Sequence, residues 1–226
     1  MRRTRIKICG LRSQEEVDAA VRAGADAVGF VFAARSPRRI DPDAAAQLVM
    51  SLPPFVRAVA VFKDQSPADV ARIADQACID MVQLHGALSL SQLSKIAEQL
   101  TVVRALRTPG ELLAWSANPD VDLLMIDASE GTGARADAAA ESPIPPPSSD
   151  VSPAWAELAS LRAASDDLGI ILAGGLTPSN VADAIRTVRP FAVDVSSGVE
   201  DSPGLKNPAK IAAFCAAVRA ADASLP

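Results

Sequence analysis

The sequence has no tyrosine, one histidine and few aromatic residues, which make up 4% of its 226 positions. A single histidine argues against a histidine-based metal site. The three cysteines are odd in number and unpatterned, which argues against a disulfide framework and favours a reducing, cytoplasmic compartment. No apolar run approaches the ~20 residues that span a bilayer. No apolar segment of an export signal follows the basic N-terminus.

Acidic residues outnumber basic residues, 27 to 22. The formal net charge is -5 and the pI is about 4.9, so we expect no nucleic-acid partner, and no membrane partner either. Hydrophobic residues make up 49% of the chain and are mainly Ala, Val, Ile and Leu, which is typical of alternating strand and helix layers. We expect a small molecule as the partner, and a chain that is a monomer or a homodimer.

Eight short apolar segments are each followed by a helical pattern. The expected strands are 5–9, 26–32, 56–62, 80–84, 101–106, 122–126, 170–172 and 191–193. Repeated β-then-α units imply a parallel sheet with right-handed crossovers. We therefore predict a single (β/α)₈ barrel over residues 1–226, with an open doubly wound sheet as the alternative.

The helices are predicted from their start signals and apolar spacing. Ser13 and Glu16 form a capping-box pattern, and Thr177–Pro178 is typical of a helix start. We interpret Cys78 and Cys215 as packing residues within helices. The expected helices are 14–23, 42–51, one that begins at 66–67, 89–99, 109–115, 154–165, one that begins at 177–178, and 208–221.

One connection is nearly twice as long as the others. Residues 134–153 are rich in Pro, Ser and Ala and contain almost no core-forming side chains. We interpret them as a flexible insertion in the sixth βα loop rather than as a domain boundary. Deletion of 136–148 is expected to leave the fold intact.

The last two predicted strands end in small residues. Gly174 and Gly175 follow one strand, and Ser196 and Ser197 follow the next. Backbone N–H groups at such breaks can approach an anion closely. A (β/α)₈ barrel frequently binds phosphate after its seventh and eighth strands, so this pattern favours the closed barrel over the open sheet.

Other polar residues gather where the predicted strands end. In a barrel these ends meet on the face that carries active sites, so the pattern indicates an enzyme. The residues are Cys9, Arg35, Arg38, Gln83, His85, Arg104, Asp127, Asp194 and Ser196.

Several motifs, in the same order, resemble one family. They are KICGL, GADAVGFVF, SPR, VQLHG, AGGLTPSNV and VDVSSGVE with a following PG. Together they resemble phosphoribosylanthranilate isomerase of tryptophan biosynthesis, from residue 6 to about 214. The resemblance implies a (β/α)₈ barrel that performs an Amadori rearrangement of a phosphoribosyl substrate without cofactor or metal.

The resemblance also implies roles for individual residues. It makes Cys9 the base and Asp127 the acid, and a thiol near its usual pKa of ~8.5 is partly thiolate at neutral pH. The implied substrate-binding residues are Arg38 for the anthranilate carboxylate, Asp194 near the bridging amine, His85 as a lining residue, and Gly174, Gly175, Ser196 and Ser197 for the phosphate.

Other interpretations stay open at this point. Cys9 alone would more often be a buried structural thiol, and Arg38 a solvated surface residue. A second interpretation is a related barrel isomerase of the histidine pathway. The chemistry of that family resembles the use of two aspartates, whereas the first strand here ends in cysteine. A non-catalytic phosphosugar-binding barrel would keep the glycine-serine loops but lose Cys9 or Asp127, and both are present.

Overall fold

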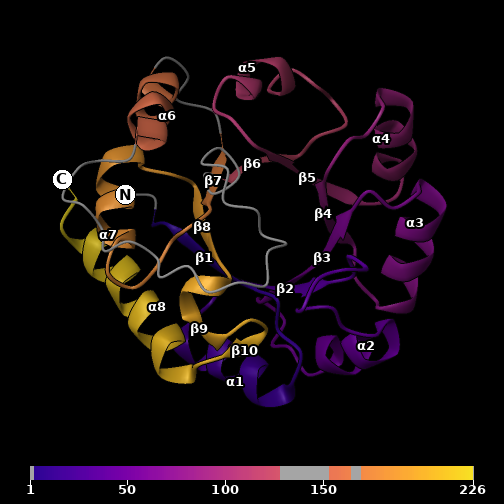
Figure 1. Ribbon diagram of the computed structural model, residues 1–226, viewed down its shortest axis with the longest axis horizontal. Helices are drawn as coiled ribbons and strands as arrows, with labels where there is room; N and C mark the ends of the chain where they lie inside the picture. Colours follow the sequence, from indigo (N-terminus) through magenta and orange to yellow (C-terminus); the bar gives the residue numbers. More distant parts are fainter. Residues whose placement is uncertain (1–2, 128–152, 164–168, 226) are drawn as a thin grey trace.

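The computed structural model describes residues 3–127, 153–163 and 169–225. Eight parallel strands close into a barrel in chain order, and helices surround it, as Figure 1 shows. The predicted (β/α)₈ barrel is confirmed and the open sheet is wrong, because β1 pairs with both β2 and β8. The predicted insertion at 134–153 lies outside the described residues, except for its last residue.

The barrel strands lie within a residue or two of the predicted segments. They are β1 (Arg5–Cys9), β2 (Ala27–Val31), β3 (Arg57–Lys63), β4 (Met81–His85), β5 (Thr101–Leu106), β6 (Leu123–Asp127), β7 (Ile170–Ala173) and β8 (Ala192–Val195). Several extend one or two residues beyond the predicted C-terminal limit, because polar residues such as His85 and Asp127 still pair in the sheet.

Most helices begin at a side chain that caps the first free N–H groups, such as Ser66 before α3 and Asn207 before α8. None of the helices in the described residues is long and apolar enough to cross a membrane. The helices are α1 (Gln14–Ala23), α2 (Pro42–Met50), α3 (Pro67–Gln76), α4 (Leu90–Ala97), α5 (Glu111–Trp115), α6 (Pro153–Ala163), α7 (Val181–Val188) and α8 (Pro208–Ala223).

The predicted start of α7 is wrong. The helix begins at Val181, not at Pro178, because Thr177 opens a turn that the side chain of Asn180 closes. The Asn180 Oδ1 accepts a hydrogen bond of 2.8 Å from the Thr177 N–H, and its Nδ2 donates to the Gly175 carbonyl. This turn keeps the loop after β7 compact.

Two smaller predictions also need correction. Cys78 is exposed and lies after the end of α3 with a left-handed φ of 56°, so it is not a helical packing residue. The capping box at α1 is only half formed: Ser13 caps Glu16, but the Glu16 carboxylate accepts from the N–H groups of Arg12 and Lys206. Cys215 is buried in α8 as predicted.

A short hairpin after β8 was not predicted. A 3-10 turn, η2 (Ser197–Val199), leads into β9 (Glu200–Ser202), which pairs antiparallel with β10 (Leu205–Lys206). Figure 1 shows this hairpin beside α1 and α8. It contributes two buried charged residues, Glu200 and Lys206, which lie next to the strand ends.

Side chains along a barrel strand point alternately outward to the helices and inward to the barrel. Ile6 and Ile8 of β1 join the large apolar cluster between strands and helices. Cys9 instead packs with Val31 and Val61 in a small separate cluster. The alternation therefore points the Cys9 side chain into the barrel, as well as that of Lys7 two residues before it.

Candidate active site

A cavity of about 500 Å³ opens among the C-terminal ends of the barrel strands. It brings together six of the predicted site residues. They are Cys9, Arg38, His85, Asp127, Asp194 and Ser196. Of the nine polar residues predicted to gather at the strand ends, eight line this cavity, whereas Arg104 lies within β5 and lines a separate cavity that His85 also lines.

Cys9 lies at the end of β1 and is 6% exposed. Its partner residue on β2 is Gly29, where a Cβ atom would lie only 2.8 Å from the Cys9 Sγ and 3.2 Å from the Lys7 Nζ. The missing side chain thus makes the space that the thiol and the ammonium share. Ser196 Oγ donates a hydrogen bond of 3.1 Å to the Cys9 carbonyl, which fixes the strand end to the loop after β8.

Lys7 and Asp194 form an ion pair inside the barrel. The Lys7 Nζ lies 2.8 Å from the Asp194 Oδ1, and the side chains are 6% and 8% exposed. Burial lowers the pKa of Lys7, but Asp194 and Cys9 outweigh this effect and the net shift is upward. Lys7 is therefore a cation held close to the Cys9 thiol.

Burial raises the pKa of the Cys9 thiol above its usual value. Lys7 opposes this shift most strongly, Asp194 adds to it, and Lys206 opposes it more weakly. The expectation of a thiol near its usual pKa is thus wrong, since apolar neighbours disfavour the thiolate. The two lysines reduce the cost of forming the thiolate in this environment.

Asp127 ends β6, three strands from β1 around the barrel, and is half-buried. It pairs in register with Ala173 of β7 and lines the same cavity as Cys9. A proton donor and a proton acceptor can therefore contact one molecule from two sides of the barrel mouth.

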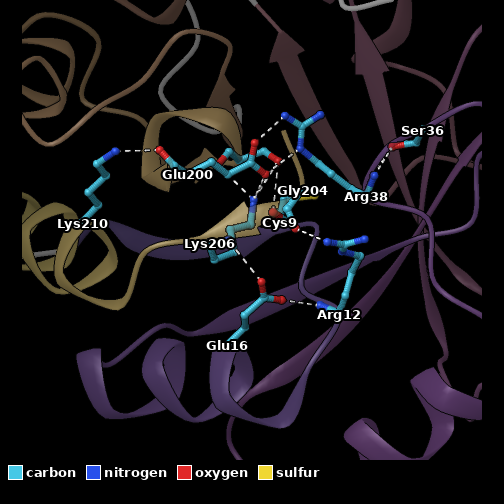
Figure 2. Close-up of polar contacts among 10 residues, drawn as sticks. Cys9, Arg12, Glu16, Ser36, Arg38, Glu200, Gly204, Lys206 and Lys210 are labelled. Atoms are coloured by element: carbon cyan, nitrogen blue, oxygen red, sulfur yellow. Dashed lines mark hydrogen bonds and ion pairs between the residues drawn. The ribbon is translucent and has the colours of Figure 1, made fainter. Parts of the chain in front are cut away.

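Arg38 follows β2 and lines the cavity with its guanidinium engaged by Glu200. Its Nε and Nη2 donate hydrogen bonds of 2.8 and 2.7 Å to the two Glu200 oxygens (Figure 2). This hydrogen bonding is the main cause that raises the pKa of Arg38. Arg35 also lines the cavity but is exposed, whereas the backbone of Arg39 forms an isolated parallel β-bridge with Val31.

His85 ends β4 beside Gln83, and their side-chain nitrogens lie 2.7 Å apart. Burial lowers the pKa of His85 to about 4, so the ring is neutral at physiological pH. In the described part of the chain, no group of three or more His, Cys, Asp or Glu residues could hold a metal ion.

The loop after β7, which contains Gly174 and Gly175, lies beside the loop after β8, which contains Ser196 and Ser197. Gly174 and Gly175 have left-handed φ values of 87° and 66°, which favour glycine over other residues. A Cβ at Gly198 would lie 1.8 Å from the Leu176 carbonyl oxygen, so the two loops touch backbone to backbone. Ser196 lines the cavity, but Gly174, Gly175 and Ser197 are not among the described residues that line it.

Sequence reasoning missed three charged residues around the site. Lys7 had a usable signal, because its alternation with Cys9 in a buried strand places both on one face. Glu200 ends the VDVSSGVE motif, but no pattern indicated a role for it, and Lys206 had no signal because it lies in a hairpin that no periodicity predicted.

The family model described as N-(5'phosphoribosyl)anthranilate (PRA) isomerase matches residues 6–143 and 154–217. The N-(5'-phosphoribosyl)anthranilate isomerase of Dechloromonas aromatica is 44% identical over 226 residues, covering 99% of this chain and 100% of that protein.

Solved structures agree with this match. The phosphoribosyl anthranilate isomerase from Thermus thermophilus has a TM-score of 0.79 at 32% identity, covering 96% of this chain and 99% of its own. A phosphoribosyl anthranilate isomerase in complex with reduced 1-(o-carboxyphenylamino)-1-deoxyribulose 5-phosphate has a TM-score of 0.78 at 33% identity, with the same coverage. The chain therefore belongs to the phosphoribosylanthranilate isomerase family.

Proposed function

We propose that Cys9 and Asp127 are the base and the acid with which this chain isomerises N-(5-phosphoribosyl)anthranilate to 1-(2-carboxyphenylamino)-1-deoxyribulose 5-phosphate, in tryptophan biosynthesis. The observation that carries the proposal is that both side chains line one cavity together with Arg38 and Asp194. This aldose–ketose isomerisation needs two proton transfers on neighbouring atoms of one sugar. A positioned acid or base typically contributes ~10² to 10⁴-fold to each transfer.

The reaction begins at the furanose ring oxygen. The Asp127 carboxyl group donates its proton to this oxygen as the bond from C1 to the ring oxygen breaks. The nitrogen lone pair then forms the C1–N double bond, which gives an open-chain iminium ion. Asp127 is left as a carboxylate.

Cys9 acts in the second step. Its thiolate takes the proton from C2, and the electron pair of that C–H bond forms the C1–C2 double bond while the iminium nitrogen recovers its lone pair. The resulting enol becomes the ketone when C1 gains a proton from solvent and the C2 hydroxyl loses one to solvent. Exchange with solvent also returns a proton to the Asp127 carboxylate and removes the proton from Cys9, so both groups regain their starting states. No net proton is gained or lost, so the overall reaction is an isomerisation.

Lys7 and Asp194 support this chemistry in different ways. The Lys7 cation stabilises the Cys9 thiolate, whose pKa burial would otherwise raise further. Because Lys7 donates to Oδ1 of Asp194, the other oxygen can accept the N–H of the bridging amine. One buried pair thus serves both the base and the substrate nitrogen.

The remaining roles in binding follow from charge and shape. Arg38 binds the anthranilate carboxylate, which suits a planar guanidinium. His85 lines the cavity as a neutral ring. The phosphate is held by the two touching loops after β7 and β8, through Gly174, Gly175, Ser196 and Ser197.

The test is turnover by the purified chain of the anthranilate substrate and, separately, of the related aminoaldose of histidine biosynthesis. We expect conversion of the anthranilate compound, with the second compound converted at least ~10²-fold more slowly. Binding of the anthranilate compound without turnover would refute the proposal in favour of a phosphosugar-binding barrel.

We place the protein in the cytoplasm, on its tryptophan-pathway family and its free cysteines. We expect a monomer or a homodimer, and light scattering on the purified chain distinguishes the two. Residues 1–226 are proposed to form one domain with 134–153 as a flexible insertion, and retention of the folded state after deletion of 136–148 tests this.

A further inference from the structure

Glu200 is a buried carboxylate that contacts two cations. Its side chain is 4% exposed and its Oε1 accepts from the Lys206 Nζ at 2.6 Å as well as from the Arg38 Nε at 2.8 Å. Its Oε2 accepts from the Arg38 Nη2 at 2.7 Å. Figure 2 shows Glu200 between the two cationic side chains. Three hydrogen bonds outweigh burial and lower the pKa of Glu200, so it is an anion.

Contacts fix both the aliphatic stem of Arg38 and one edge of its guanidinium. A Cβ at Gly10 would lie 2.7 Å from the Arg38 Cδ, so the aliphatic stem of Arg38 lies over the backbone that follows β1. Glu200 holds the side edge of the guanidinium, formed by Nε and Nη2. Within the described part of the chain, Nη1 donates no hydrogen bond, and Figure 2 shows it on the side away from Glu200.

A guanidinium has five N–H donors in a fixed plane, so it can bind one carboxylate along its side edge and another at its Nη1–Nη2 end. Arg38 lines the cavity that Cys9 and Asp127 share. The unused end of Arg38 is therefore the part that a carboxylate in this cavity can reach.

The charges of the cluster agree with this arrangement. The Lys206 Nζ contacts three acceptors, one on Glu200 and two on Ser196, as expected for an ammonium with three donors. One anion between two cations leaves the cluster with one positive charge. A bound carboxylate would neutralise it, whereas Arg38 and Glu200 alone would already be neutral.

We propose that Glu200 is a positioning residue that fixes the guanidinium of Arg38 so that its Nη1–Nη2 end binds the carboxylate of the anthranilate ring. The inference rests on the proposed function, because it requires Arg38 to be the carboxylate ligand. Glu200 acts only through Arg38 and touches no reacting atom. It sets the preference for an aromatic amine that carries a carboxylate.

The experiment measures binding of two stable compounds by calorimetry. One is reduced 1-(2-carboxyphenylamino)-1-deoxyribulose 5-phosphate, and the other lacks only the ring carboxylate. We expect wild type to prefer the first by about 10- to 100-fold, the range for a charge-assisted pair. In Glu200→Gln this preference should fall by about tenfold, while the affinity for the second compound changes less than about threefold.

Asp201→Asn is the matched control, because Asp201 lies on the same hairpin but pairs with Lys210 and Asn207 in an exposed position. It should keep the wild-type preference. If Glu200→Gln fails to fold, Glu200→Asp keeps the charge near Lys206 but is one methylene too short to hold both partners, and should show the same selective loss.

An equal loss of affinity for both compounds in the Glu200 variants would overturn the proposal and make Glu200 a purely structural residue. An unchanged preference would overturn it as well. Absence of turnover in the wild type would refute the proposed function instead, and the binding measurement separates these results because it needs no catalysis.

Discussion

Gly29→Ala is expected to disable the site by displacing the Cys9 thiol. The new methyl group would lie 2.8 Å from the Sγ, 3.2 Å from the Cys9 Cα and 3.2 Å from the Lys7 Nζ. Carbon atoms in contact normally lie about 3.5–4.0 Å apart, so the sulfur must move by roughly 1 Å. The Cα cannot yield, because Cys9 is in β1 and pairs with Gly29 across the sheet.

This overlap sets the expected loss of unfolding free energy and the expected loss of catalytic rate. Overpacking a filled interior costs about 1–3 kcal/mol of unfolding free energy. A displacement of about 1 Å at a reacting group costs on the order of 10²-fold in rate. We therefore expect kcat to fall about 10²-fold while the variant stays folded. Steady-state turnover and urea denaturation measure the two effects.

Gly110→Ala is the control, because no heavy atom lies within 4 Å of the added methyl group and the backbone there is helical. It should keep wild-type kcat and stability to within about 1 kcal/mol. A Gly29→Ala variant with wild-type kcat would refute the reasoning that the missing side chain makes room for the thiol.

Two further predictions concern protons in the cavity. Lys7→Met removes the cation that lowers the pKa of Cys9, so the pH at which kcat reaches half its maximum should rise. An unshifted pH–rate profile in Lys7→Met would contradict this. Burial lowers the pKa of His85 to about 4, so an unfolded chain with an ordinary histidine binds more protons between pH 4 and 6.5, and stability falls as the pH falls through this range. Urea denaturation gives the free energy of unfolding at pH 7 and at pH 4.5. Between these two pH values, His85→Gln should lose up to about 3 kcal/mol less of this free energy than wild type. Equal losses in both proteins would show that His85 does not contribute.

The strands and the shared cavity could be predicted because their causes are local. Each strand is a short apolar segment, and parallel strand ends in a barrel must meet on one face. Cys9, His85 and Asp127 each end a strand, so their convergence follows once the barrel closes. The chain order of the strands then sets which strand ends are neighbours.

The ionic partners could not be predicted, because they depend on contacts between distant segments. Arg38 and Glu200 are 162 residues apart, and Lys7 and Asp194 are 187 residues apart. The raised pKa of Cys9 also depends on burial among Val31 and Val61, which no local pattern shows. Alternation predicts which way a side chain faces but not what it meets.

The start of α7 illustrates a local competition. Thr177 and Pro178 resemble a helix start, but Asn180 closes a turn on Thr177 and delays the helix to Val181. Asparagine side chains often compete with helical hydrogen bonds in this way. The result places the loop after β7 against the loop after β8, where the phosphate is proposed to bind.

The most direct measurement is kcat/KM for N-(5-phosphoribosyl)anthranilate in wild type, Cys9→Ser and Asp127→Asn, with the exposed-thiol variant Cys78→Ser as control. We predict that each site variant loses about 10²-fold or more, as expected for loss of one positioned proton donor or acceptor, and that Cys78→Ser keeps the wild-type value. Folded Cys9→Ser or Asp127→Asn protein with wild-type kcat/KM would contradict the pairing of these two residues across the barrel mouth.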